Sequence, residues 1–344
     1  MSKQVVGFTS GSTGTPLKIV RNRTESTEVN ASYNYPFLEC GVKSTDNFVA
    51  ISALTESIRW AKKYSRINPL RISSTVVPTY TSEKTLIDTL RRIDPDVISI
   101  YPSILANLSC YDVSDLDPKL IFTIGETLTQ HCRDLVKDAF GLEINDVYGS
   151  EEFCRMAFEC NEHCGLHMIT DYNVIEFIDE DGEPVTSGEP GEIIITGLIN
   201  RTSPLIRYEI GDVGIPTDEK CPCGRTWPII KSIQGRTNDY LILSSGRKLY
   251  FIHLAFLIYE EIESNVFCIS QYQIVQEKRN RIAFKVVKGK KFDPEILLRI
   301  KETLKAFFNR LGEDMEIYMQ LVDEIPMERT GKRRVLISKI RQEN

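Results

Sequence analysis

Residues 120–124 read Leu-Ile-Phe-Thr-Ile, a short apolar run typical of a fully buried strand. A stretch with helical character, residues 128–140, follows it directly. Outward from this pair lie a second buried run at 97–100, with a helical stretch at 83–92 before it, and a third at 48–51. This alternation of strand and helix predicts a largely parallel sheet covered by helices.

The character of the sequence changes after residue 173. Two strand-like runs, 174–178 and 191–195, flank the turn-rich segment 179–184, which reads Asp-Glu-Asp-Gly-Glu-Pro. This pattern predicts a smaller β-rich part of the same domain.

The segment after Gly235 has the pattern of a separate α+β unit. A helix is expected at 294–308, where apolar residues recur at helical spacing: Ile296, Ile300, Leu304 and Phe307. Strands are expected around it, at 270–276, 282–287 and 317–322. We therefore predict an α/β protein. Its large N-terminal domain, residues 1–235, has a mainly parallel, helix-covered sheet and a β-rich subdomain, and a hinge at 236–239 leads to a small α+β C-terminal domain, residues 240–344.

Composition excludes several classes of protein. The formal net charge of −6 does not fit a general nucleic-acid footprint, which needs a basic surface. Apolar runs are too short to cross a bilayer, and Met1 is not followed by a signal-peptide core. We expect a cytoplasmic protein without nucleic-acid or membrane partners, whose nine cysteines are reduced thiols or metal ligands.

A glycine-rich string near the start of the chain is the strongest single motif. It reads Phe-Thr-Ser-Gly-Ser-Thr-Gly-Thr-Pro-Leu-Lys over residues 8–18. Small residues let the backbone approach a polyphosphate, the hydroxyls donate hydrogen bonds and the lysine adds a positive charge. The candidate phosphate ligands are Thr9, Ser10, Gly11, Ser12, Thr13, Gly14 and Lys18. The alternative is a flexible turn between two strands.

This string resembles the phosphate-binding motif of the adenylate-forming superfamily, which contains acyl-CoA synthetases, adenylation domains and luciferase-like enzymes. Within it, the string is most similar to the phenylacetate–CoA ligase and coenzyme F390 synthetase-like branch. Residues 124–129 resemble the Gly-Ala-Glu-Pro turn of that family. The resemblance implies that Gly125 and Glu126 border the adenine and acyl pockets, although an ordinary strand-to-helix turn explains them equally well.

A third motif, Asp-Val-Tyr-Gly-Ser-Glu-Glu at 146–152, resembles the family pattern Tyr-Gly-x-Thr/Ser-Glu. The resemblance implies that Tyr148 lies against the adenine, that Gly149 and Ser150 belong to the nucleotide site, and that Glu152 holds Mg²⁺. Because Glu151 stands where the family has a hydroxyl residue, either glutamate could be the ligand. Two acidic residues at a helix start are the alternative.

Two motifs further along the chain complete the expected nucleotide site. Residues 204–212 resemble Pro-x-Ile-Arg-Tyr-x-Thr-Gly-Asp, which implies that Asp212 accepts hydrogen bonds from both ribose hydroxyls. Residues 233–241 resemble Gly-Arg-x-Asp-Asp, which implies that Arg236 contacts the nucleotide. Asn238 stands where relatives commonly place an aspartate as the pivot of domain rotation, so its role as the pivot stays open.

The last motif, at 325–334, resembles the C-terminal Pro-x-x-x-x-Gly-Lys pattern. The resemblance implies that Lys332 bridges the substrate carboxylate and the α-phosphate, where a fixed cation stabilises the transition state. A basic, solvated tail is the alternative.

Cysteine and histidine residues form two clusters that suit a metal. Cys221 and Cys223 flank a proline, and Cys160, His163, Cys164 and His167 fall within eight residues upstream. Some phenylacetate–CoA ligase relatives have a similar pattern, which implies a structural zinc held by Cys160, His167, Cys221 and Cys223. Cys164 or His163 could replace one of them, and unliganded thiols and histidines are the alternative.

The whole resemblance implies an AMP-forming ligase. Such an enzyme activates a small carboxylic acid with ATP and Mg²⁺ to acyl-AMP, then passes the acyl group to the thiol of CoA or of a carrier-protein phosphopantetheine. Transfer to an amine or a protein cysteine, or a non-catalytic nucleotide-binding role, are the rival interpretations. The family has a long segment before the phosphate loop, whereas here the loop begins almost at Met1. The chain would be a short member or half of a split enzyme, and the resemblance leaves a homodimer and an acyl carrier protein partner open.

Overall fold

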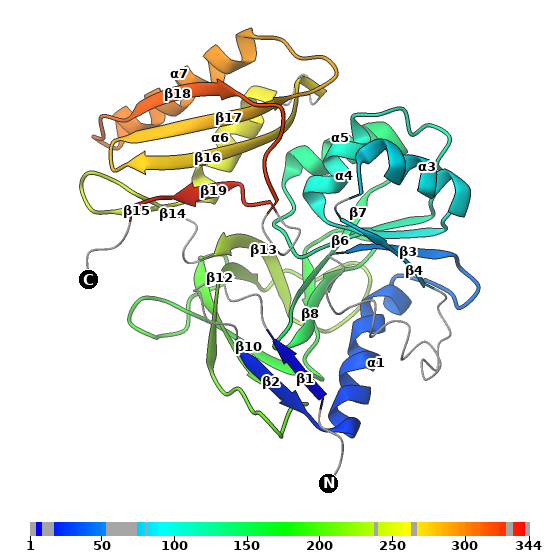
Figure 1. The fold of residues 1–344 in the computed structure, drawn as a ribbon. Helices are drawn as coiled ribbons and strands as arrows, with labels where there is room; N and C mark the ends of the chain where they lie inside the picture. Colours follow the sequence, from blue (N-terminus) through cyan, green and yellow to red (C-terminus); the bar gives the residue numbers. More distant parts are fainter. Residues whose placement is uncertain are drawn as a thin grey trace.

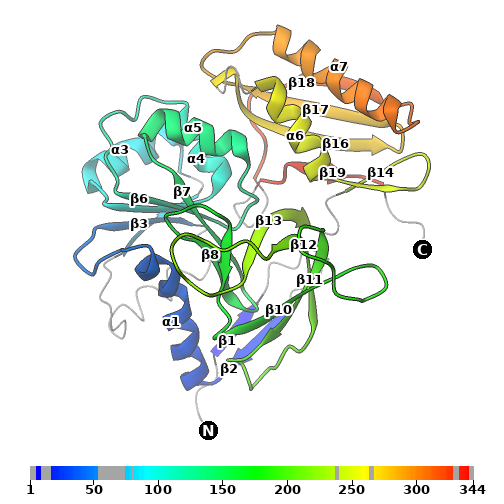
Figure 2. The ribbon, with the colours of Figure 1, turned by 180° about the vertical axis from the view of Figure 1, so that it is seen from behind.

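The computed structural model describes residues 5–8, 17–52, 74–79, 81–236, 240–262, 267–327 and 333–340, and all structural statements concern these residues. They form an 11-stranded sheet, a four-stranded sheet and two two-stranded hairpins (Figures 1 and 2). No helix in the described ranges is both long and apolar enough to cross a bilayer.

One half of the large sheet is parallel. Its strands lie in the order β7-β6-β5-β3-β4, and each neighbouring pair among them is parallel. The strands are β3 (Phe48–Ser52), β4 (Ser74–Pro78), β5 (Val97–Ile100), β6 (Leu120–Ile124) and β7 (Ile144–Ser150). The strands predicted at 48–51, 97–100 and 120–124 are therefore confirmed.

Helices cover both faces of this parallel half (Figure 1). Helices α3 (Glu83–Ile93), α4 (Pro102–Ser109) and α5 (Gln130–Phe140) lie on one face, and α1 (Arg23–Glu39) lies on the other. The side chains of β5 alternate between the two: Ile98 packs with α3, α4 and α5, whereas Val97 packs with Phe37 of α1. Burial on both faces explains why these strands are continuous apolar runs.

Local capping residues set the helix bounds. Helix α5 begins at Gln130, two residues later than predicted, because the Thr129 side chain caps it by accepting the Cys132 amide. It ends at Gly141, whose φ of 69° suits glycine. Helix α1 was not predicted, yet Asn22 and Glu25 form a complete capping box at its start.

The other half of the large sheet is antiparallel. Beyond β7 it continues in the order β8-β9-β13-β12-β11-β10. These strands are β8 (Cys154–Glu159), β9 (Leu166–Met168), β10 (Asn173–Ile178), β11 (Gly191–Gly197), β12 (Tyr208–Thr217) and β13 (Ile229–Arg236). The predicted β-rich part is thus continuous with the parallel half, because β7 pairs with β6 on one edge and β8 on the other.

Hairpin β1 (Val5–Phe8) and β2 (Lys18–Arg21) is a separate two-stranded sheet beside the large one. Its strands are antiparallel, with Phe8 opposite Lys18. Two antiparallel strands therefore flank the predicted phosphate loop, whose residues 9–16 lie outside the described ranges.

The C-terminal part has its own sheet, in the order β18-β17-β16-β19. Its strands are β16 (Ile269–Lys278), β17 (Arg281–Lys288), β18 (Glu316–Leu321) and β19 (Leu336–Ser338), with hairpin β14 (Tyr240–Ile242) and β15 (Lys248–Tyr250) beside it. Helices α6 (Phe251–Ile262) and α7 (Glu295–Arg310) share its apolar core. The predicted helix and strands are confirmed, except that Phe308 rather than Phe307 is the fully buried fourth apolar residue of α7.

The C-terminal sheet lies against helices α4 and α5 of the large domain (Figure 1). His131 Nε2 donates to the Ile269 carbonyl oxygen at 2.8 Å, and Gln271 Nε2 donates to the Ser103 carbonyl oxygen at 2.9 Å. Phe267 and Met327 add apolar contacts with the core beneath α3, α4 and α5. Polar and apolar contacts together join the two parts.

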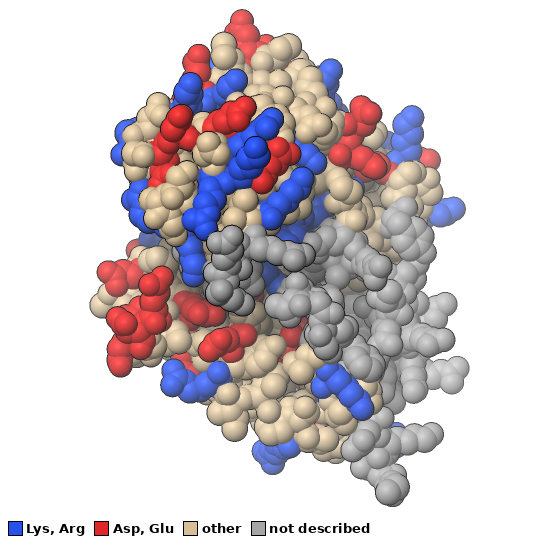
Figure 3. Space-filling view, turned by 60° about the vertical axis from the view of Figure 1, so that its left-hand side comes forward, with Lys and Arg blue, Asp and Glu red and all other residues tan. Residues whose placement is uncertain are grey.

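Charged side chains are unevenly distributed over the surface. Figure 3 shows basic side chains in a band across its upper part and acidic side chains gathered at the lower left. The turn between β10 and β11 has five exposed acidic residues: Asp179, Glu180, Asp181, Glu183 and Glu189. The net charge of −6 therefore does not reflect an even mixture of the two signs.

Candidate active site and metal centre

Most residues of the predicted nucleotide site lie in the described ranges, at strand ends. Gly125 and Glu126 follow β6, Tyr148, Gly149 and Ser150 end β7, Asp212 lies in β12 and Arg236 ends β13. Lys18 begins β2 and is exposed. The candidates outside the described ranges are Thr9, Ser10, Gly11, Ser12, Thr13, Gly14, Asn238 and Lys332.

Residues from three of the predicted motifs meet at one point of the sheet. The Tyr148 hydroxyl donates to Asp212 Oδ2 at 2.7 Å, and Arg236 Nε lies 3.6 Å from Asp212 Oδ1. Asp212 and Arg236 are direct partners in the register of β12 and β13. Burial and the neighbouring Asp212 raise the pKa of Tyr148, so the phenol keeps its proton.

Arg21 holds the turn that carries the two candidate magnesium ligands. Its Nη2 donates to the backbone carbonyls of Glu151 and Glu152, each at 2.9 Å. Both carboxylate side chains therefore project from a turn fixed to β2, the strand after the predicted phosphate loop. Residues 151–153 form a turn and no helix, so the helix-start interpretation of the two glutamates is wrong.

Arg21 is not predicted from the sequence, because its neighbours in sequence give no sign of a contact with a residue 130 positions away.

Gly149 lies where the backbones of β7 and β8 approach closely. A Cβ atom there would come within 2.4 Å of the Cys154 carbonyl oxygen. The register of the two strands also shifts between Tyr148 and Gly149. Glycine is thus required by the close approach of two backbones, whatever ligand binds nearby.

Glu126 contacts both the large domain and the C-terminal part. Its Oε2 accepts the Ser103 amide at 2.9 Å, and its Oε1 accepts the Ser103 hydroxyl at 3.0 Å and the Arg333 amide at 2.6 Å. Gly125, with φ 82°, turns the chain before it. The strand-to-helix turn is confirmed, and the predicted role of Glu126 beside the adenine and acyl pockets stays a prediction.

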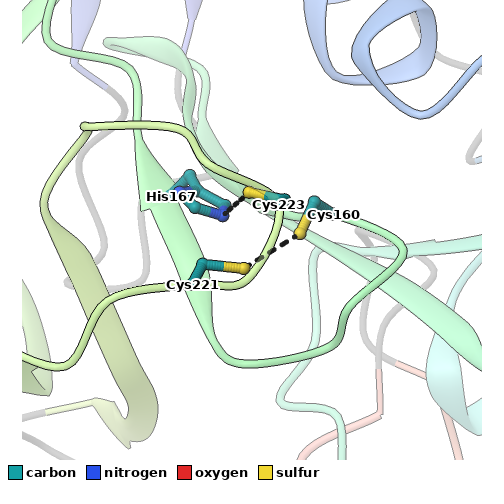
Figure 4. A group of neighbouring side chains, drawn as sticks. All are labelled: Cys160, His167, Cys221 and Cys223. Carbon is teal, nitrogen blue, oxygen red and sulfur yellow. Dashed lines mark hydrogen bonds between the residues drawn. The ribbon is translucent and has the colours of Figure 1, made fainter.

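The predicted zinc ligands come together from three segments (Figure 4). The ligand atoms of Cys160, His167, Cys221 and Cys223 all lie within 4.8 Å of one another. The Cys160 and Cys221 sulfurs are 3.5 Å apart, and Cys223 Sγ is 3.4 Å from His167 Nε2. Tetrahedral zinc with Zn–S bonds of about 2.3 Å separates two sulfur ligands by roughly 3.8 Å, so the group fits this ion without large rearrangement.

The surroundings favour the metal-binding forms of His167 and Cys223, whereas burial raises the pKa of Cys160 and raises that of Cys221 to about 12, so these two thiols are protonated without an ion. Burial, together with Arg225, lowers the pKa of His167, which keeps the imidazole neutral. Burial alone would raise the pKa of Cys223, but hydrogen bonds from the Arg225 backbone and side chain lower it to about 7. Arg225 is itself held by two contacts to the Glu39 carboxylate, at 2.8 and 3.1 Å.

The two alternative ligands lie apart from this group. Cys164 is exposed and its sulfur lies 3.3 Å from the Glu162 carbonyl oxygen, and His163 occupies a turn with φ 51°. The four-residue group contains neither of them.

Comparison with solved structures defines the class of fold. The structure matches a 2-hydroxyisobutyryl-CoA ligase in the postadenylation state with 2-HIB-AMP at a TM-score of 0.76 and 19% identity, covering 97% of this chain and 73% of that one. The same ligase in the thioesterification state gives 0.58. The chain has the fold of the adenylate-forming ligases, as predicted.

Sequence comparison then gives the particular relatives. The chain is 29% identical to phenylacetate-coenzyme A ligase of Thermus thermophilus over 233 residues, which is 64% of this chain and 48% of the relative. It is 26% identical to protein CapK of Staphylococcus aureus over 265 residues, which is 75% of this chain and 56% of the relative. Residues 245–339 match the CapK C-terminal domain model. The chain is a relative of the phenylacetate–CoA ligases and CapK, and it spans about half the length of these two relatives.

Proposed function

We propose that this protein activates a small carboxylic acid with ATP to an acyl-adenylate, with release of pyrophosphate, and then transfers the acyl group to a thiol. The observation that carries the proposal is the meeting of Tyr148, Asp212 and Arg236, which come from motifs up to 88 residues apart. The register of β12 and β13 by itself pairs the opposite charges of Asp212 and Arg236. A nucleotide site in addition accounts for these residue types, because ribose hydroxyls need an acceptor and phosphates need a cation.

The proposed first step forms one bond and breaks one. A carboxylate oxygen attacks the α-phosphorus, the bond to the β-phosphate oxygen breaks and pyrophosphate leaves. Asp212 accepts the ribose hydroxyls, and Lys332 stabilises the charge that develops between the carboxylate and the α-phosphate. Mg²⁺, held by Glu152 or Glu151, would offset the negative charge of the phosphates.

In the proposed second step a thiolate attacks the acyl carbonyl carbon and AMP leaves with the bonding electron pair. We infer a hinge at 236–239 with Asn238 as its pivot, between domains at 1–235 and 240–344. This division is supported by the two separate sheets, which share no strand.

We also propose a structural zinc on Cys160, His167, Cys221 and Cys223. The proposal is supported by the spacing of the ligand atoms, all within 4.8 Å, and by three sulfur donors and one nitrogen donor. When bound, the ion would crosslink the end of β8, β9 and the segment before β13. It takes no part in the two proposed steps.

A panel of carboxylic acids in a pyrophosphate-release assay tests the activity and finds the substrate together. We expect acid-dependent release with Mg·ATP, reduced on the order of 100-fold by Asp212→Ala because a ribose acceptor is lost. Asp218→Ala, an exposed carboxylate just after β12, is the matched control and should keep full activity. Absence of release with every acid would contradict the proposal.

The two half-reactions separate the role of Lys332. Lys332→Ala should abolish acid-dependent ATP–pyrophosphate exchange, while thioester formation from supplied acyl-AMP survives. Equal loss of both would contradict this division. Assaying CoA, a phosphopantetheinyl carrier protein and an amine side by side identifies the acceptor.

A further inference from the structure

One carboxylate connects the two domains next to the proposed catalytic lysine. Glu126 lies after β6 and accepts two hydrogen bonds from Ser103, at the start of α4, and one from the Arg333 amide. Arg333 is the residue directly after Lys332. At 2.6 Å, its contact with Glu126 is the shortest of the three.

Residues on both sides of the segment 328–332 contact the large domain. Met327, before the segment, packs against the core beneath α3, α4 and α5. Arg333, after it, donates to Glu126. One residue further along, Gln273 Nε2 of the C-terminal sheet donates to the Arg334 carbonyl oxygen at 2.8 Å. The Glu126 carboxylate therefore holds the chain to the large domain at the residue directly after Lys332.

The partners of Glu126 divide unequally between the domains. Burial raises the pKa of Glu126, and the hydrogen bonds from Arg333 and Ser103 oppose that shift. Both Ser103 bonds are internal to the large domain and would persist if the C-terminal domain rotated away. Only the Arg333 bond depends on the present arrangement, so this bond distinguishes one domain arrangement from another.

We propose that Glu126 is a positioning residue, which holds the backbone beside Lys332 during adenylation and releases it before acyl transfer. This inference rests on the proposed function, because it assigns Lys332 to the first step alone. Ser103 orients the carboxylate with two donors. Gln271 of the C-terminal sheet helps to hold Ser103 in place, because its Nε2 donates to the Ser103 carbonyl oxygen.

The test compares Glu126→Ala with Ser103→Ala in the full chain. Alanine removes both carboxylate oxygens and with them the contact to the Arg333 amide, whereas glutamine can keep that contact through its remaining oxygen. Acid-dependent pyrophosphate exchange should fall roughly 10- to 100-fold, and at least about fivefold more than thioester formation from supplied acyl-AMP. Ser103→Ala removes the hydroxyl donor but keeps the amides of Ser103 and Arg333 as donors to Glu126. Pyrophosphate exchange should therefore fall only about threefold. Equal loss of both half-reactions in Glu126→Ala, or unchanged pyrophosphate exchange, would overturn the inference.

Hydrogen exchange provides a readout that does not depend on activity. In the ligand-free protein, the Arg333 amide hydrogen should exchange faster in Glu126→Ala than in the parent protein, and Ser103→Ala should leave its exchange nearly unchanged. This measurement tests the contact between Glu126 and Arg333 separately from the proposed function. Should the parent protein activate no acid, faster exchange at Arg333 still supports the contact while the proposed function fails. Unchanged exchange at Arg333 overturns the inference whatever the activity.

Discussion

Arg21 is the residue with the largest contribution to the candidate site that local sequence did not reveal. One guanidinium nitrogen holds two successive carbonyl oxygens, those of Glu151 and Glu152. Its Nε is buried without a partner among the described side chains and main-chain groups. The turn is thus held by a cationic side chain from another sheet, in addition to the Ser150 hydroxyl, which accepts the Phe153 amide at 3.2 Å.

We expect Arg21→Met to weaken magnesium dependence without unfolding the protein. Hydrogen bonds from a charged donor contribute about 1.5–3 kcal/mol, so the Mg²⁺ concentration for half-maximal pyrophosphate release should rise on the order of 10-fold. Arg23→Met, an exposed arginine two residues further along, is the matched control. A magnesium titration unchanged in Arg21→Met would show that the turn holds its shape without the arginine.

At the residue scale, the roles that the motifs imply for single residues stay predictions, and the structure shows which of these residues lie together. Tyr148, Asp212 and Arg236 were each identified from local patterns, and the structure brings all three together. The hydrogen bond between Tyr148 and Asp212 was not predicted, because it depends on the register of strands 64 residues apart. Partners such as Ser103 and Gln271 have no distinctive neighbours in sequence, so only the fold identifies them.

Among the elements, the β7–β8 hairpin is closely restricted by a single residue. Gly149→Ala would place Cβ 2.4 Å from the Cys154 carbonyl oxygen, and backbone atoms cannot yield as a side chain can. We expect a loss of about 1–3 kcal/mol in the free energy of unfolding. Gly197→Ala is the control, because its Cβ would meet only the Phe153 ring, at 3.2 Å. Chemical denaturation measures both, and equal losses would refute the argument from backbone contact.

The Cys and His group joins three elements, so its metal should stabilise them together. We expect one zinc per chain by elemental analysis. Chelation should lower the unfolding midpoint by roughly 5–10 °C, as for a loss of about 3 kcal/mol. Cys221→Ser should lose the metal, whereas Cys164→Ser, an exposed thiol outside the group, should retain it. Equal zinc content in both variants would exclude the proposed ligand set.

Elements whose apolar residues follow one clear pattern were predictable from the sequence, and elements with an interrupted pattern were not. Strands β5 and β6 are continuous apolar runs and were predicted with their observed bounds. Helix α1 was missed because polar residues interrupt its apolar face and Pro36 lies inside it. Its capping box, Asn22 with Glu25, was a local signal that could have revealed it. Strand β9 is only three residues long; it pairs with β8 on one side and with β13, 62 or more residues away, on the other, and it has no such local signal.

At the scale of the whole molecule, the contact between domains should depend on pH through His131. This buried histidine donates to the Ile269 carbonyl across the contact, and burial lowers its pKa to about 4, with Asp134 partly opposing the shift. A histidine whose pKa is lower in the folded than in the unfolded state stabilises the folded state when it is neutral. The folded state here is the one in which the two domains are in contact. That state therefore loses stability as pH falls from about 6.5 towards 4.

The expected effect is about 2 kcal/mol between pH 7 and pH 5. His131→Gln keeps a donor but cannot titrate, so the variant should lose this share of the pH dependence. Asp146, whose pKa burial raises to about 7, titrates in the same range, but its contribution is common to both proteins and cancels in the difference. Chemical denaturation of both proteins at both pH values measures this difference in the free energy of unfolding. A difference near zero would mean that His131 stays accessible to protons in the closed state.

The continuity of the large sheet has a consequence for how the protein melts. Strand β7 belongs to the parallel and the antiparallel half at once, so neither half can separate without exposing unpaired backbone of the other. Calorimetry should therefore record one cooperative heat-absorption peak for the region up to Arg236, although its composition suggests two subdomains. Any second peak would belong to the C-terminal sheet, which shares no strand with the large one.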